Sequence, residues 1–180
     1  MITIRNVRAI ATAPGGINLV VVKVETSEPD LFGLGCATFT QRYAAVKAAV
    51  DEHLAPLLVA RDVARIEELQ QLMMVHGYWR NGPVLNNAIS GVDQALWDIK
   101  GKVADMPLYD LLGGKMREAA AVYRHADGSD LAVVEERVRG FFDDGVRHVR
   151  VQFGGYGGTA SEGMAPDGAL SGAYYHPRRY

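Results

Sequence analysis

Residues 78–114 read YWRNGPVLNNAISGVDQALWDIKGKVADMPLYDLLGG, and this stretch decides how the chain folds. Pro83 suits the first turn of a helix, where no backbone N–H is needed. Pro107 marks the end, because the residue before a proline is driven out of the helical conformation. Between them, apolar residues recur at steps of three and four, on one stripe of a helix: Leu85, Ala88, Ile89, Val92, Ala95, Leu96, Ile99 and Val103. The stretch therefore predicts a long helix with one buried face.

Three features refine this helix. Gly91 lies in its interior, where glycine costs about 1 kcal/mol relative to alanine, so we expect a neighbouring segment to pack closely against it. Asp98 and Lys102 lie one turn apart and predict a weak ion pair on the outer face. The segment PLYDLLGG then predicts one more helical turn that ends at Gly113 and Gly114.

The residues before this helix predict an antiparallel meander followed by two shorter helices. Three strands are expected, at residues 2–12, 19–26 and 33–40. A change of phase in the first strand predicts a bulge near Asn6. Helical periodicity continues over residues 43–57 and 66–73. Strands followed by helices are typical of an α+β domain, which we expect over residues 1–115.

After Gly114 the pattern changes to alternating strand and helix. We expect a strand at residues 120–125, a helix capped by Asp130 that runs through Phe142, and a second strand at residues 148–152. A strand, a helix and a strand in this order predict parallel pairing with a right-handed crossover. From Phe153 to Tyr180 no periodicity is present, and a long glycine-rich tract of this kind is typical of a functional lid or of a disordered stretch.

The segment GVDQALWDIKGKVADMPLYDLLGG resembles the end of the capping domain in the enolase superfamily, of the mandelate racemase and muconate lactonising type. The flanking YWRNGPVLNNAISG resembles more narrowly the mannonate dehydratase group, which includes proteins named as starvation-sensing. The resemblance implies a capping domain at residues 1–115. Residues 116–180 would then hold the first two strands of a (β/α) barrel and a glycine-rich loop. Two strands cannot close a barrel, so we expect the chain to be the N-terminal part of a longer enzyme.

Two residues of the second barrel strand are candidates for the active site. Arg150 and Gln152 stand two apart and so face the same way. The Arg-x-Gln pattern resembles mannonate dehydratases, which implies that Arg150 is catalytic and that Gln152 binds substrate. Because arginine stays protonated, Arg150 would act as a fixed cation that holds substrate or lowers the pKa of a neighbouring base. An arginine in an ion pair on the barrel rim is the alternative.

Further candidates follow from the same resemblance. His125, expected at the end of the first barrel strand, would contact substrate hydroxyls, or else only pack on its strand. Asp127 stands where the family often has asparagine, and we expect this change to be neutral. Thr40 falls where the group commonly has an asparagine that binds substrate, and an exposed loop threonine is an equally good interpretation. Trp79 would bind substrate from the capping domain or pack at a subunit contact.

Glu162 aligns with the tyrosine that the group uses as a base. A carboxylate can serve as that base if partial burial raises its pKa while Arg150 keeps it ionised. Tyr156 is the rival candidate, and a solvated glutamate in a loop is the plain alternative.

The activity implied is that of a Mg²⁺-dependent sugar-acid dehydratase, which removes the proton α to a carboxylate and eliminates the β-hydroxyl. The metal ligands would lie beyond residue 180, so no metal site is expected within this chain. A racemase or epimerase on the same scaffold is the first alternative, and a catalytically weak regulatory relative is the second. The family also implies a homo-oligomer.

Composition limits the other classes of function. The 180 residues carry a net charge of −2, which argues against a nucleic-acid or anionic-membrane partner. Hydrophobic residues make up 48% of the chain, enough for a sizeable core, and no apolar run approaches the length of a membrane span. Cys36 is the single cysteine, so no internal disulfide can form and a reducing cytoplasm is expected.

Overall fold

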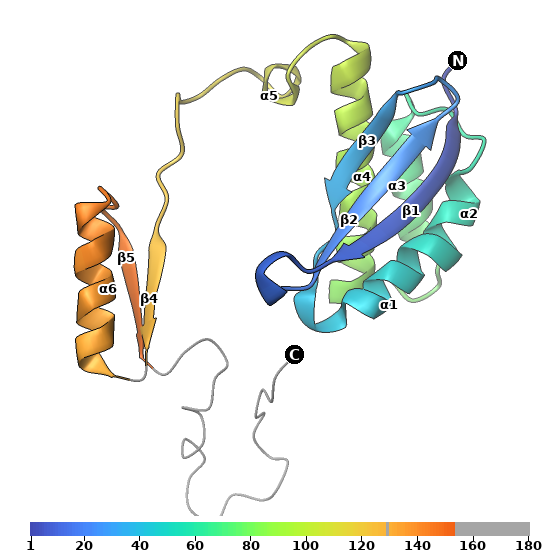
Figure 1. The fold of residues 1–180 in the computed structure, drawn as a ribbon. Coiled ribbons are helices and arrows are strands. Elements are labelled where there is room, and N and C mark those ends of the chain that lie inside the picture. Colours follow the sequence, from blue (N-terminus) through green and yellow to red (C-terminus); the bar gives the residue numbers. More distant parts are fainter. Residues whose placement is uncertain (129, 154–180) are drawn as a thin grey trace, which may run out of the picture. The chain divides into compact units, whose positions relative to one another are not determined.

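The computed structural model describes residues 1–128 and 130–153. The chain divides into two compact units, Met1–Met116 and Arg117–Tyr180, each with its own sheet. The first unit holds three antiparallel strands in the order β1-β2-β3, and the second holds the parallel pair β4-β5 (Figure 1).

The central strand of the first unit is β2, Leu19–Thr26, which pairs on its two sides with β1, Ile4–Thr12, and β3, Phe32–Cys36. Val20, Val22 and Val24 alternate along β2 and are fully buried, because the helices cover this face of the sheet. The pairing register shifts between Ile4 and Asn6, which confirms the predicted bulge.

The prediction of a third strand over residues 33–40 is wrong at its C-terminal end, because β3 stops at Cys36. Thr38 is the cause. Its hydroxyl oxygen accepts a hydrogen bond from the backbone N–H of Val20 at 3.0 Å, in the place that a strand carbonyl would otherwise take. The chain then turns through a short 3₁₀ segment, Thr40–Arg42.

The predicted helix over residues 43–57 forms, but it is not regular throughout. It consists of α1, Tyr43–Ala48, a π-helical segment, Ala49–Leu54, and α2, Ala55–Leu58. Pro56 lacks the N–H that an α-helical bond to the preceding turn needs, and such a loss favours a local change of helical type. The next helix, α3, spans Ile66–Val75 and buries Ile66, Leu69 and Met73 as its periodicity predicts.

The long helix α4, Pro83–Val103, begins at Pro83 as predicted and runs beside β3 (Figure 1). It buries the predicted stripe from Ala88 to Ile99. It ends at Val103, four residues before Pro107. Between these two residues, Asp105 takes a left-handed conformation with φ of 49°. The short helix α5, Leu108–Leu111, follows, and Gly113 and Gly114 end it with positive φ as expected.

Glycines let the backbone of α4 lie directly on the sheet. A Cβ on Gly33 would come within 1.9 Å of the carbonyl oxygen of Ala95, and a Cβ on Gly35 within 1.9 Å of that of Gly91. A Cβ on Gly91 would in turn meet the Cβ of Ala37 at 2.7 Å, which confirms the close approach predicted for this glycine. The helix and β3 therefore touch backbone to backbone, a contact that no residue with a side chain would permit.

Side chains of α4 also bind the outer edge of β3. Gln94, Asp98 and Lys102 lie at four-residue steps, about 6 Å apart along the helix, close to the about 6.8 Å that separates alternate residues of a strand. Their backbone partners are alternate residues of β3: Cys36 for Gln94 at 3.1 Å, Leu34 for Asp98 at 2.9 Å and Phe32 for Lys102 at 2.7 Å. Asp98 and Lys102 do form the predicted pair, at 2.8 Å. However, the pair lies along the edge of the sheet and not on a purely solvent-facing side.

The opposite edge of the sheet is closed by the same arrangement. The backbone N–H of Ala9 in β1 donates to Asp51 at 2.7 Å, and Lys47 donates to the carbonyl of Ala9 at 3.0 Å. Lys47 and Asp51 are also ion-paired with each other. At both edges an aspartate accepts a hydrogen bond from a strand N–H, and a lysine donates one to a strand carbonyl. Backbone groups that could pair with another strand are therefore already hydrogen-bonded.

The second unit consists of β4, Arg124–Gly128, α6, Leu131–Asp143, and β5, Val149–Phe153. The predicted parallel pairing is confirmed. Asp130 caps α6 as predicted, accepting a hydrogen bond from the N–H of Ala132 at 2.7 Å. The strand expected at residues 120–125 is misplaced, because pairing with β5 starts only where Arg124 lies beside Val149.

Candidate active site

Four polar residues share one face of the parallel pair β4-β5. The register places His125 beside Arg150 and Asp127 beside Gln152. We call these four residues the polar strand face. Helix α6 lies against the opposite face of the two strands (Figure 1).

Three contacts show which side of the strands α6 covers. Ala126 is fully buried. A Cβ on Gly128 would meet a methyl group of Val134, in α6, at 3.0 Å. The guanidinium of Arg124 lies 5.2 Å from the ring centre of Phe141, also in α6. Since side chains alternate along a strand, the residues between these three, and their partners in β5, belong to the other face.

His125 is half-buried and stacks on Tyr123, with ring centroids 5.1 Å apart and planes inclined by 27°. The expectation that it ends its strand is wrong, because it is the second residue of β4. Asp127 lies nearer the C-terminal end, where the active sites of parallel barrels are built. In β5, Arg150 is exposed and Gln152 is half-buried, as two residues facing the same way near that end.

Asp127, which the sequence predicts to be a neutral replacement for asparagine, forms an ion pair with a residue of α6. Arg137, from α6, donates from Nη1 to both the carboxylate and the backbone carbonyl of Asp127, each at 2.5 Å. An uncharged asparagine could not form this ion pair. Sequence reasoning missed Arg137. The available signal was its place three residues after Val134, which faces the strands, because such residues lie on neighbouring parts of a helix surface.

The two candidates in the first unit have different surroundings. Thr40 begins the 3₁₀ segment and is half-buried. Trp79 lies between α3 and α4, is 87% exposed, and packs edge-on against Tyr78 with ring centroids 5.2 Å apart. Glu162 and Tyr156, the two candidates for the base, lie outside the described residues.

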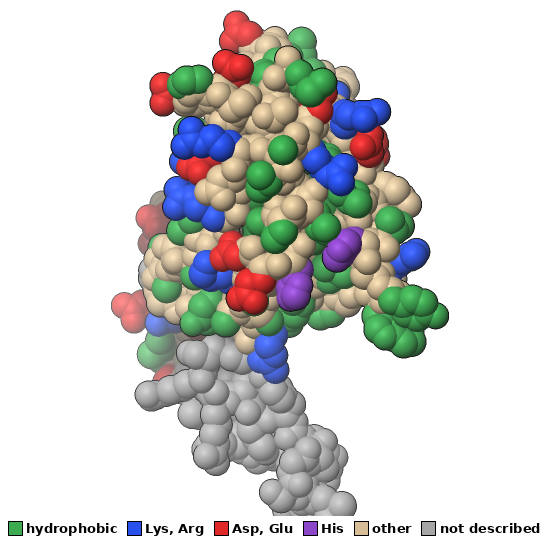
Figure 2. All heavy atoms as spheres, turned by 90° about the vertical axis from the view of Figure 1, so that its right-hand side faces the viewer, with side chains coloured by type: hydrophobic (Ala, Val, Ile, Leu, Met, Phe, Trp, Pro, Cys, Tyr) green, Lys and Arg blue, Asp and Glu red, His purple; other side chains and the backbone are tan. Residues whose placement is uncertain are grey.

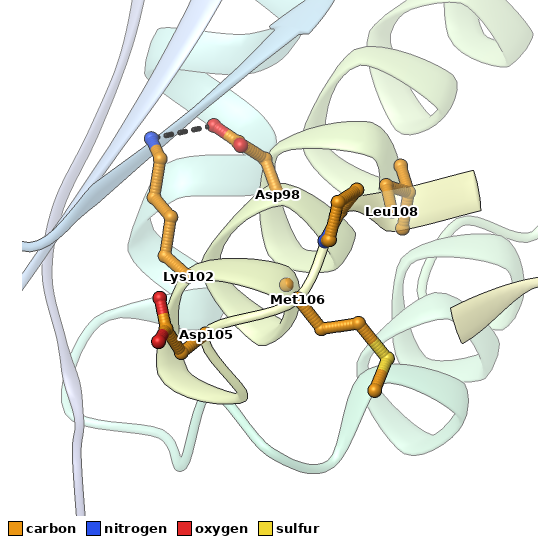
Figure 3. A pocket seen from close by; sticks show the side chains of 7 residues that line it. Asp98, Lys102, Asp105, Met106 and Leu108 are labelled. Atoms are coloured by element: carbon orange, nitrogen blue, oxygen red, sulfur yellow. Dashed lines mark hydrogen bonds and ion pairs between the residues drawn. The ribbon is translucent and has the colours of Figure 1, made fainter. Parts of the chain in front are cut away.

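Within residues 1–128 and 130–153, no three His, Cys, Asp or Glu side chains gather in a way that could hold a metal ion. The described part of the chain therefore offers no ligand set for Mg²⁺. A hollow of about 360 Å³ at the C-terminal end of α4 is lined by Asp98, Lys102, Asp105 and Met106 (Figure 3). Because Asp98 and Lys102 are bound to each other and to β3, we do not regard this hollow as a catalytic site.

Figure 2 shows one face of the molecule on which acidic and basic side chains are interspersed. Among the described side chains drawn there, no broad patch of one sign is formed, whereas nucleic-acid binding relies on such a basic patch. None of the helices that the structure describes combines the length and the apolar character needed to cross a membrane.

The fold and the polar strand face together define a class: an α+β unit with a three-stranded antiparallel sheet, followed by a parallel βαβ unit of the kind that begins a barrel. The chain belongs to the family described as mandelate racemase / muconate lactonizing enzyme, N-terminal domain, which matches residues 3–113. This result confirms the predicted capping domain and its place in the enolase superfamily.

Two of the three relatives compared below are dehydratases by name, and the third is described as an enolase. A D-galactonate dehydratase family member of Enterocloster bolteae is 58% identical over 183 residues, which cover 99% of this chain and 45% of that protein. The crystal structure of an enolase from Pantoea ananatis, with bound D-gluconate and Mg, matches at 58% identity and a TM-score of 0.82, over 87% of this chain and 38% of that one. A putative dehydratase from Salmonella enterica serovar Typhimurium matches at 27% identity and a TM-score of 0.76, over 84% and 43%.

The chain thus spans less than half the length of these relatives. The narrower resemblance to mannonate dehydratases is not reflected in their names, which refer to D-galactonate dehydratases and to bound D-gluconate.

Proposed function

We propose that the chain is the front part of a Mg²⁺-dependent acid-sugar dehydratase, with the capping domain at residues 1–115 and the first two barrel strands and active-site loop at residues 116–180. The observation that carries the proposal is the register that sets His125 beside Arg150 on one face of two parallel strands. The names of the relatives and the D-gluconate and Mg bound in one related structure support it. The described residues offer no ligand set for Mg²⁺, so the roles proposed for them are substrate binding and charge stabilisation.

In the proposed reaction a base removes the proton from the carbon α to the carboxylate. The electron pair of that C–H bond forms the double bond of an enol as the β-hydroxyl leaves with a proton, as water. The enol then takes up a proton at the β-carbon and releases the proton of its hydroxyl group, which gives a 2-keto-3-deoxy acid. Loss of one water is the whole change in composition, so no oxidant or reductant is needed.

Three residues of the polar strand face, Arg150, His125 and Gln152, have roles that fit their chemistry. Arg150 provides a permanent positive charge that stabilises negative charge developing on the substrate's carboxylate or on the base. His125 and Gln152 offer ring N–H and amide groups for substrate hydroxyls. Thr40 and Trp79 are further substrate contacts on the strength of the family resemblance, and Glu162 is the base, with Tyr156 as its rival.

The decisive experiment incubates the full-length protein with Mg²⁺ and D-gluconate, D-galactonate or D-mannonate in deuterated water. Mass spectrometry then follows both loss of water and uptake of deuterium. Loss of water supports the proposal and identifies the sugar acid. Deuterium uptake without loss of water would indicate a racemase or epimerase, and the absence of both changes would indicate a regulatory relative; either outcome contradicts the proposal.

Two pairs of variants test the assigned roles. Arg150→Met should lower kcat at least about a hundredfold. Arg139→Met should not, because Arg139 pairs along the helix surface with Glu135 at 2.6 Å. Glu162→Gln should abolish deuterium exchange while Tyr156→Phe retains it. The reverse result would assign the base to Tyr156.

The quaternary state and the compartment belong to the same proposal. We expect a homo-oligomer, which sedimentation of the full-length protein would detect. We expect it in the cytoplasm, in keeping with the single Cys36.

A further inference from the structure

The polar strand face contains a carboxylate that an anionic substrate would have to approach. Asp127 lies two residues beyond His125 in β4 and beside Gln152 in the register. A sugar acid is itself negatively charged at neutral pH, since carboxylic acids of this kind ionise near pH 4. An unpaired Asp127 would repel such a substrate, and the repulsion would act across the few ångströms that separate neighbouring groups in a site.

Arg137 supplies the opposite charge from behind the strands. Its guanidinium donates to the carboxylate of Asp127 and to the carbonyl oxygen of the same residue. We infer that Arg137 neutralises Asp127 so that the polar strand face accepts an anionic sugar. Arg137 is thus a positioning residue that sets the charge of the site without contacting the substrate. This inference rests on the proposed function.

Stabilisation of the fold does not account for the ion pair between Asp127 and Arg137. Both side chains are 48% exposed, and ion pairs between exposed groups contribute little to stability. Helix α6 is held against β4 by other contacts, namely the packing of Val134 against Gly128 and of Phe141 against the guanidinium of Arg124. The neighbouring pair of Arg139 and Glu135 is also exposed but stays within the helix, so it provides a control of similar chemistry away from the strands.

The test uses the full-length protein with D-gluconate. If the dehydration assay identifies another sugar acid as the substrate, that acid is used as well. Arg137→Met should raise KM about five- to tenfold while kcat stays within about twofold, as expected for one uncompensated charge near an anion in a partly solvated site. The increase should shrink as salt is raised, because salt screens the repulsion. Arg139→Met should leave KM unchanged.

Two further variants separate charge from shape. Arg137→Lys keeps the positive charge but loses the planar fork, so its KM should stay close to the wild-type value. Asp127→Asn combined with Arg137→Met removes both charges and should restore the wild-type KM. A purely structural role predicts the opposite: Arg137→Lys would fail, and the double variant would be no better than Arg137→Met.

The outcomes distinguish this inference from the proposed function. If the protein dehydrates a sugar acid but Arg137→Met leaves KM unchanged, or Asp127→Asn fails to restore it, the inference alone is overturned. Calorimetry can also show that D-gluconate binds, that it binds more weakly to Arg137→Met, and that this difference in affinity depends on salt. If so, but no water is lost from the sugar acid, the inference stands and the dehydratase function is overturned. The absence of any sugar-acid binding overturns both.

Discussion

Replacing Gly35 by alanine should destabilise the first unit strongly, because the helix α4 lies directly on this residue. The new Cβ would lie 1.9 Å from the carbonyl oxygen of Gly91, 2.9 Å from its carbonyl carbon and 3.0 Å from the nitrogen of Ala95. Ordinary contact begins at 3.4 Å, so the helix backbone would have to retreat by about 1.5 Å. Neither partner is a flexible side chain that could move aside.

A retreat of this size would also break bonds along the edge of β3. The Gln94 side chain accepts from the N–H of Cys36 at 3.1 Å and donates to its carbonyl at 3.3 Å, and neither bond survives a further displacement of 1.5 Å. Overpacking costs about 1–3 kcal/mol, and each lost bond about 0.5–1.5 kcal/mol. We therefore expect a loss of about 4 kcal/mol, within a range of about 2–6 kcal/mol.

Urea unfolding followed by circular dichroism measures this loss as a decrease of about 1 M or more in the midpoint. Gly77→Ala is the matched control in the same unit, because a Cβ there would meet only the carbonyl oxygen of Trp79 at 3.4 Å. Its midpoint should stay close to the wild-type value. A Gly35→Ala protein as stable as the control would show that α4 does not rest on β3 and would refute the backbone contact.

Three further predictions concern single carboxylates. Asp98→Ala should cost about 1–2 kcal/mol and speed hydrogen exchange at the Leu34 amide, whose acceptor it removes, and unchanged exchange would contradict the edge contact. Burial, and then the charge of Glu67, raises the pKa of Asp93 above its ordinary value of 3.8. The folded state thus binds the proton more tightly than the unfolded state does. The free energy of unfolding therefore falls as pH rises from the ordinary pKa of Asp93 through its raised pKa in the folded state. Asp93→Asn should therefore raise the urea midpoint at pH 7 but not at pH 3; an equal effect at both would exclude ionisation as the cause. Asp130→Ala should destabilise α6 by about 1 kcal/mol in thermal unfolding, whereas Asp130→Asn should retain the cap.

Much of the fold could be predicted because its signals are local. The 3.6-residue period identifies the buried face of α4, Pro83 identifies its start, and an aspartate before an apolar run identifies the cap of α6. Gly91 indicates a close contact, because a glycine inside a helix lowers stability unless a neighbouring segment packs where a side chain would lie. Pro83 and Asp130 act within one turn of their own position, and Gly91 indicates a close contact without showing which segment makes it. These signals can therefore be read without knowing the rest of the chain.

The polar contacts could not be predicted in the same way. The sequence shows that Asp98 and Lys102 are neighbours, but their partner strand lies 64 residues from Asp98, and only packing of α4 on the glycines of β3 brings it there. Hydrophobic periodicity indicates which face of a helix is apolar, but it does not indicate which segment the polar face contacts.

The candidate site shows the same division. The sequence by itself determined that Arg150 and Gln152 share one face of a strand, because side chains alternate with a period of two residues. Only the tertiary structure decided that His125 lies beside Arg150 and that Arg137 reaches Asp127. Register between two strands depends on how the intervening helix packs, and an ion pair depends on where two separate elements come together. Neither quantity is encoded in the spacing of residues along one element.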